Sequence, residues 1–143
     1  MEYAYSLKTE RVKEKDFPYN GTHIDCTSKL VNFAQKLKDS DTEKMMLLYL
    51  DAQNNLIGIH VVVGTLNQAV VYPREVFKHA LLHCAAAIIM IHNHPSGFVR
   101  PSDCDIRLTN KVKEVGKELD ILLHDHLIVA EDRFYSMRED GLL

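Results

Sequence analysis

The chain has 143 residues, of which 46% are hydrophobic and 26% charged, and its formal net charge is −3. These values suit one compact domain with a buried core, and no apolar run approaches the ~20 residues of a membrane-spanning helix. In the main charged stretches lysines alternate with acids, which is typical of a solvated surface rather than of a nucleic-acid-binding patch. Three cysteines without a Cys-x-x-Cys pair predict neither a disulfide framework nor a cysteine zinc site, and without a signal-peptide pattern we expect a cytoplasmic protein.

The N-terminal third is expected to contain an arm and a helix, followed by a β-hairpin. Residues 1–22 alternate weakly between apolar and polar side chains and predict an arm or an edge strand. Between Ser28 and Leu37 the apolar residues fall on one face of a helix. The apolar runs 44–50 and 56–63 are joined by a polar turn and predict two paired strands.

The middle of the chain is expected to contain a strand, a helix and a second, fully buried strand. A glycine break precedes the strand expected at 64–72, and Pro73 stands at the first position of a helix that runs to His83. The run 85–91 is apolar without polar alternation, as in a central strand that is covered on both faces. The predicted buried face of the helix consists of Val76, Phe77, Ala80, Leu81 and Cys84.

The C-terminal part is expected to contain one long helix and two strands. Ser102 is a candidate N-cap for a helix that runs to Leu119, and strands are predicted at 121–130 and 134–137. The apolar stripe that this helix would turn toward a sheet consists of Leu108, Val112, Val115 and Leu119. The order of the elements predicts an α/β fold with a mixed β-sheet flanked by helices.

Two histidines stand where the central strand ends. Side chains two residues apart on an extended chain point to the same side, about 6.6–6.8 Å apart along it, so His92 and His94 can bind one ion. Pro95–Gly97 turns the chain, and Asp105 then lies on the inward face at the N-terminus of the next helix, aimed back at the histidines. Two imidazoles and one carboxylate leave a fourth tetrahedral position open for water, which is typical of a catalytic zinc site.

The second half of this motif also has a plainer interpretation. Ser102-x-x-Asp105 is an ordinary capping motif, with an N-cap serine and an acid at the third helical position. A single His-x-His is equally weak evidence when it stands alone. It is the combination of the two, at the end of a buried strand, that favours a metal site, and capping and metal binding can coexist on the same residues.

The sequence resembles the RadC-like branch of the JAB/MPN metalloenzyme superfamily, whose signature is a glutamate, then His-x-His, seven residues and Ser-x-x-Asp. In this chain His92, His94, Ser102 and Asp105 stand at those spacings. By the resemblance Glu43 matches the upstream glutamate, whereas from the residues alone several other glutamates are equal candidates. The likeness extends beyond the signature to the segments 64–81, 122–129 and 133–143.

This resemblance implies a JAB/MPN fold, whose general architecture is similar to that of the cytidine deaminases. It covers residues 43–143, which we expect to form one compact unit, with residues 1–42 as an arm and a helix packed on it. The loop Phe98–Arg100 departs from the Gly-Asp-Pro sequence common in relatives, and we expect it to shape the rim of the site without touching a ligand. A homodimer is left open by the sequence.

The resemblance also implies a role for each residue of the signature. His92, His94 and Asp105 would hold Zn²⁺, and a water whose pKa the ion lowers to about 7 would be the nucleophile. Glu43 would take the proton of this water and pass it to the leaving amine, while Ser102 would donate to the oxyanion. If the strand opened by Glu43 runs antiparallel to the strand that ends at the histidines, Glu43 faces them. We therefore expect a zinc-dependent hydrolase of the JAMM type that cleaves peptide or isopeptide bonds in a peptide or protein substrate.

Other functions have to be weighed against this one. The RadC family has long been labelled as DNA repair, so the alternative is a DNA-repair-associated protein that acts on or near DNA. The acidic net charge, and the lack of room for the helix-hairpin-helix module of relatives, count against direct DNA binding. A deaminase would need His-x-Glu and Pro-Cys-x-x-Cys, which the sequence lacks. Cys104 suggests a cysteine protease, but a helix would turn it away from Asp105.

A second His-x-His pair, His124-Asp125-His126, obeys the same two-residue spacing. No Ser-x-x-Asp follows it, and both histidines lie in the middle of a predicted strand rather than at its end. We therefore interpret His126 as a hydrogen-bonded core residue and not as a metal ligand.

Overall fold

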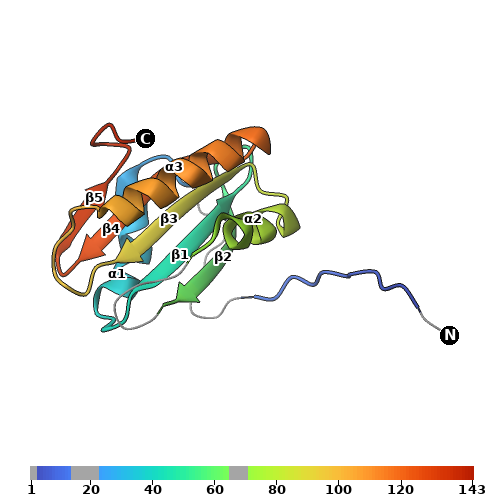
Figure 1. The fold of residues 1–143 in the computed structure, drawn as a ribbon, viewed down its shortest axis with the longest axis horizontal. Coiled ribbons are helices and arrows are strands. Elements are labelled where there is room, and N and C mark those ends of the chain that lie inside the picture. The colour runs from blue at the N-terminus through green and yellow to red at the C-terminus, as the bar shows by residue number, and fades with distance from the viewer. Residues whose placement is uncertain (1–2, 14–22, 65–70) are drawn as a thin grey trace.

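The computed structural model describes residues 3–13, 23–64 and 71–143. Within this part of the chain, five strands form one mixed sheet in the order β2-β1-β3-β4-β5, with helices on both of its faces (Figure 1). The elements are, in chain order, the 3-10 helix η1 (Thr27–Leu30), α1 (Val31–Lys38), β1 (Lys44–Leu50), β2 (Leu56–Val63), α2 (Pro73–Leu82), β3 (Ala87–Asn93), α3 (Asp103–Glu118), β4 (Leu122–Ala130) and β5 (Arg133–Ser136). The α/β class with a mixed sheet is confirmed.

Two expectations fall wholly or partly outside the described residues. The strand predicted at 64–72 lies largely in the segment 65–70, of which nothing is described. Of the expected arm, residues 3–13 are exposed and have no regular secondary structure, and residues 14–22 are outside the description. Among the helices that are described, none combines the length and the apolarity needed to cross a bilayer.

The central strand of the sheet is β3, and every one of its residues is buried. It pairs antiparallel with β1 on one side and parallel with β4 on the other. The strand extends two residues beyond the predicted end at residue 91, because His92 and Asn93 stay inside the sheet. Both side chains are only 1% exposed and find hydrogen-bond partners there, so their polarity does not end the strand.

The two faces of the sheet carry separate hydrophobic cores. The helix α1 packs on one face, whereas α2 and α3 cover the other (Figure 1). Side chains alternate along β1, so Met45 and Leu47 face α2 and α3 while Met46 and Leu48 face α1. The position of a residue in this alternation therefore decides whether its side chain reaches the α2 and α3 side, where the candidate site lies.

The predicted buried faces of α2 and α3 were partly wrong. Leu81 is 56% exposed and Cys84 is also exposed, because α2 ends at Leu82 and its buried face stops at Ala80. Leu119 is 42% exposed because it follows the last turn of α3. The residues of α3 that are fully buried are Thr109, Val112 and Gly116, so its inward face is rotated by about one position from the predicted stripe.

The burial of Gly116 in α3 goes with a close backbone approach. A Cβ atom added at Gly116 would lie 2.3 Å from the carbonyl oxygen of Ile121, so only glycine lets the helix come this near to the start of β4. The amide of Ile121 also donates to the carbonyl of Gly116 at 2.8 Å. This contact fixes the C-terminal end of a helix whose N-terminal end carries Asp105.

We expect Gly116→Ala to destabilise the protein, although the same change in an open helix stabilises by about 1 kcal/mol. The added methyl group would have to displace backbone, which typically costs about 1–3 kcal/mol. Denaturant unfolding measures this loss, with Lys117→Ala at the neighbouring exposed position as the control. A variant more stable than the wild type would show that the approach at Gly116 is not tight.

Candidate metal centre

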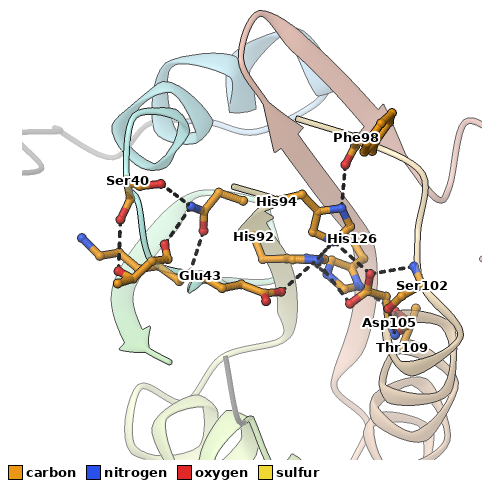
Figure 2. Close-up of polar contacts among 12 residues, drawn as sticks. Ser40, Glu43, His92, His94, Phe98, Ser102, Asp105, Thr109 and His126 are labelled. Carbon is orange, nitrogen blue, oxygen red and sulfur yellow. Dashed lines mark hydrogen bonds and ion pairs between the residues drawn. The ribbon is translucent and has the colours of Figure 1, made fainter. Parts of the chain in front are cut away.

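Four of the predicted site residues converge at one end of the central strand. Glu43, His92, His94 and Asp105 each offer a ligand atom, and these atoms all lie within 4.8 Å of one another. Figure 2 shows the four side chains pointing toward a common point from β3, from the start of β1 and from the tip of α3. The structure therefore brings together, from three separate parts of the fold, the residues that the sequence motif predicts for the site.

The pairing of β1 with β3 accounts for the place of Glu43. The two strands are antiparallel, and Met45 stands opposite His92, so the start of β1 lies beside the end of β3. Glu43 is two residues before Met45 and shares its side of the sheet. Its Oε1 atom lies 3.8 Å from His92 Nε2. The condition under which Glu43 faces the histidines is thus met.

The N-terminus of α3 holds the Asp105 carboxylate. The amide of Ser102 donates to Asp105 Oδ2 at 2.8 Å, and Ser102 Oγ accepts from the amide of Asp105 at 3.1 Å. Asp105 also approaches both imidazoles, with Oδ1 3.3 Å from His92 Nε2 and Oδ2 3.1 Å from His94 Nε2. The capping interpretation is confirmed, and the Asp105 carboxylate that completes the cap also belongs to the cluster that could hold a metal ion. The helix terminus adds a positive dipole beside this carboxylate.

Burial and charge shift the protonation of this cluster. Burial opposes ionisation of Asp105, but its hydrogen bonds with His92 and His94 outweigh it and hold its pKa well below the usual value. Burial likewise disfavours a charged His94 ring, but bonds to Asp105 and to the Phe98 carbonyl outweigh it and raise its pKa. An ionised, largely buried carboxylate beside a histidine whose pKa is raised is a setting in which a divalent cation can replace a proton.

The donor atoms suit zinc. His94 Nδ1 lies 2.7 Å from the carbonyl oxygen of Phe98, which can only accept, so a neutral His94 ring carries its proton on Nδ1. In that tautomer the Nε2 atom, which faces Asp105 and His92, offers its lone pair to an ion that takes the place of the proton bonded to Asp105. Two imidazole nitrogens and one carboxylate oxygen are a ligand set that zinc accepts with a further position left for water. The expectation that the Phe98–Arg100 loop touches no ligand was wrong, because the contact is made by a backbone carbonyl.

An asparagine that the sequence interpretation missed holds the segment around Glu43. Asn93 Oδ1 accepts from the amide of Lys44 at 2.7 Å, and Asn93 Nδ2 donates to the carbonyls of Thr42 at 2.9 Å and Ser40 at 3.4 Å (Figure 2). These bonds fix the backbone on both sides of Glu43. The available signal was a polar residue inside a buried strand, between the two histidines.

A bulge in β4 turns His126 toward the candidate metal centre. His124 has no partner in β3, because the pairing register of the two strands shifts there. Leu123 accordingly packs on the α2 and α3 side, whereas Leu127 packs on the α1 side, although a regular strand would place both on one face. The reversed alternation puts His126 on the side of α3.

The second His-x-His pair is therefore split between two surroundings. His126 is fully buried and its Nε2 lies 2.6 Å from His92 Nδ1, so its interpretation as a hydrogen-bonded core residue is confirmed. Burial lowers the pKa of His126 well below the usual value, which keeps its ring neutral. His124 bonds to Asn54 instead. Cys104 is exposed and accepts from the Arg107 side chain.

The chain was compared with known protein families and with curated proteins. The family described as "RadC-like JAB domain" matches residues 24–142. Similar proteins include the UPF0758 proteins of Methanosarcina mazei, 44% identical, of Chlorobium chlorochromatii, 42% identical, and of Alteromonas mediterranea, 45% identical, each over 109 residues. These matches cover 76% of this chain but only 48% or 49% of the relatives, so the chain spans about half the length of the curated relatives that it matches.

We expect Asp105→Asn and His94→Ala to lose Zn²⁺ that the wild type retains through gel filtration. Each change removes a candidate ligand, so the loss of affinity should exceed the roughly 10- to 100-fold that follows removal of an outer hydrogen-bond partner. Chelator competition measures the affinity, and His124→Ala is the control because this histidine lies outside the cluster. Equal zinc affinity of Asp105→Asn and the control would contradict the ligand set.

Proposed function

This chain belongs to the RadC-like JAB domain family, and we propose that it is a zinc-dependent hydrolase of the JAMM type that cleaves peptide or isopeptide bonds. The observation that supports the proposal most strongly is the convergence of His92, His94 and Asp105 with the carboxylate of Glu43 beside them. Three protein ligands with a neighbouring acid-base group are what hydrolysis by an activated water requires.

In this proposal His92, His94 and Asp105 hold the ion. When bound, zinc lowers the pKa of a water ligand to about 7 and polarises the scissile carbonyl. The ligand side chains are little exposed, at 1% for His92, 14% for His94 and 12% for Asp105. The low local dielectric that follows from this burial strengthens every charge interaction at the reacting bond.

Glu43 is the proposed proton carrier. Its side chain is 13% exposed and its Oε1 lies 3.8 Å from His92 Nε2, so it borders the ligand cluster. As the water oxygen bonds to the carbonyl carbon, Glu43 takes the proton of the water, and it delivers that proton to the nitrogen as the carbon–nitrogen bond breaks. The bonds of Asn93 to the flanking backbone keep this carboxylate in place.

Ser102 is the proposed donor to the oxyanion. Its Oγ accepts a hydrogen bond from the backbone amide of Asp105, so the hydroxyl proton is still available to donate. Such a donor, aimed at the oxygen where charge develops, is typically worth on the order of 3 kcal/mol of transition-state stabilisation. The same hydroxyl caps α3, so its oxygen is already fixed in position by the hydrogen bond from the Asp105 amide.

The alternative, an action on or near DNA, has no specific observation in its favour. The net charge of −3 provides no electrostatic attraction to phosphate. A mobility shift of duplex DNA that weakens steeply with added salt would support it.

We expect Glu43→Gln to retain zinc and the wild-type fold but to lose about 10²- to 10⁴-fold in turnover, because the amide cannot carry the proton. Turnover is measured by mass spectrometry on a proteome-derived peptide library and on isopeptide-linked lysine peptides. Glu118→Gln, at an exposed position near the end of α3, is the control. Unchanged hydrolysis by Glu43→Gln would show that another group moves the proton.

A further inference from the structure

Behind His92 lie two buried polar side chains that the proposed mechanism does not use. His126 is fully buried and Thr109 is 1% exposed. His92 Nδ1 lies 2.6 Å from His126 Nε2, and His126 Nδ1 lies 2.6 Å from Thr109 Oγ1. Thr109 Oγ1 lies 2.7 Å from the carbonyl oxygen of Asp105. Figure 2 shows this chain of contacts running from one proposed ligand to the backbone of another.

Assigning each proton to one atom gives this series of hydrogen bonds a donor-to-acceptor direction. To bind an ion through Nε2, a neutral His92 must carry its proton on Nδ1, which then donates to His126 Nε2. His126 must in turn carry its proton on Nδ1 and donate it to Thr109 Oγ1. The single hydroxyl proton of Thr109 remains for the Asp105 carbonyl, which can only accept. Every link then has one donor and one acceptor.

The opposite direction would block the site. If the Thr109 hydroxyl donated to His126 Nδ1, the proton of His126 would sit on Nε2 and point at His92 Nδ1. The proton of His92 would then sit on Nε2, where the ion has to bind. The Asp105 carbonyl, as an acceptor for the hydroxyl at the far end, favours the productive direction.

We propose that His126 and Thr109 are positioning residues that hold His92 in the tautomer whose Nε2 binds the metal. The inference rests on the metal site of the proposed function and extends it to residues outside the signature. Because both side chains are buried, water cannot replace a lost partner, and removal of the hydroxyl leaves His126 Nδ1 unsatisfied. His94 needs no such help, since a backbone carbonyl fixes its tautomer.

The test compares Thr109→Val, which removes the hydroxyl at nearly constant volume, with Thr109→Ser, which keeps it. Zn²⁺ affinity is measured by chelator competition on the whole chain, after circular dichroism has shown both variants to be folded. Thr109→Val should bind zinc about 10- to 100-fold more weakly than the wild type, and Thr109→Ser should bind within a few-fold of it. Equal affinities of the folded valine and serine variants would overturn the proposal.

A second pair of variants tests the proposal if Thr109→Val does not fold. In His126→Gln the side-chain amide oxygen can accept a hydrogen bond from His92 Nδ1, whereas the leucine side chain of His126→Leu cannot. The glutamine variant should therefore bind zinc more tightly than the leucine variant. In the zinc-loaded wild type labelled with ¹⁵N-histidine, the His126 proton should reside on Nδ1. A His126 proton on Nε2 would overturn the proposal. A wild type that binds no zinc would remove the metal site and the proposed function with it, whereas equal binding by all folded variants would remove only the positioning role.

Discussion

The candidate site depends on one largely buried carboxylate, that of Asp105, which lies between a helix terminus and two imidazoles. A carboxylate out of water is costly unless hydrogen bonds and opposite charge compensate it. Here the amide of Ser102 provides part of that compensation, and protons on the Nε2 atoms of His92 and His94, or an ion that replaces these protons, provide the rest. For these groups to meet, the turn between β3 and α3 must bring the start of α3 back to the end of β3. The candidate site therefore exists because these features of the fold coincide.

The same contacts serve folding and the proposed chemistry. The Ser102 cap that starts α3 also orients Asp105, and the antiparallel pairing of β1 with β3 brings Glu43 to the histidines. Asn93 ties the start of β1 to the end of β3. Because each group is held by backbone or buried partners, the cluster is already arranged before substrate arrives, which is how enzymes avoid reorganisation during the reaction.

Local patterns allowed the strand, the helix and the motif to be anticipated, since a period of two aligns His92 with His94 and a capping motif marks the start of α3. What could not be anticipated depends on contacts between distant segments. The bulge at His124, which turns His126 toward His92, has no signature in its own strand. The carbonyl of Phe98 and the close approach at Gly116 are backbone features that side-chain patterns do not report.

The central claim is that two imidazoles and one carboxylate bind a single zinc ion and leave it one open position. X-ray absorption spectroscopy at the zinc edge of the loaded protein tests this most directly. We expect four light-atom ligands at about 2.0–2.2 Å, two of them imidazoles, with no sulfur in the shell. A shell with a sulfur scatterer at about 2.3 Å, or with fewer than two imidazoles, would contradict it.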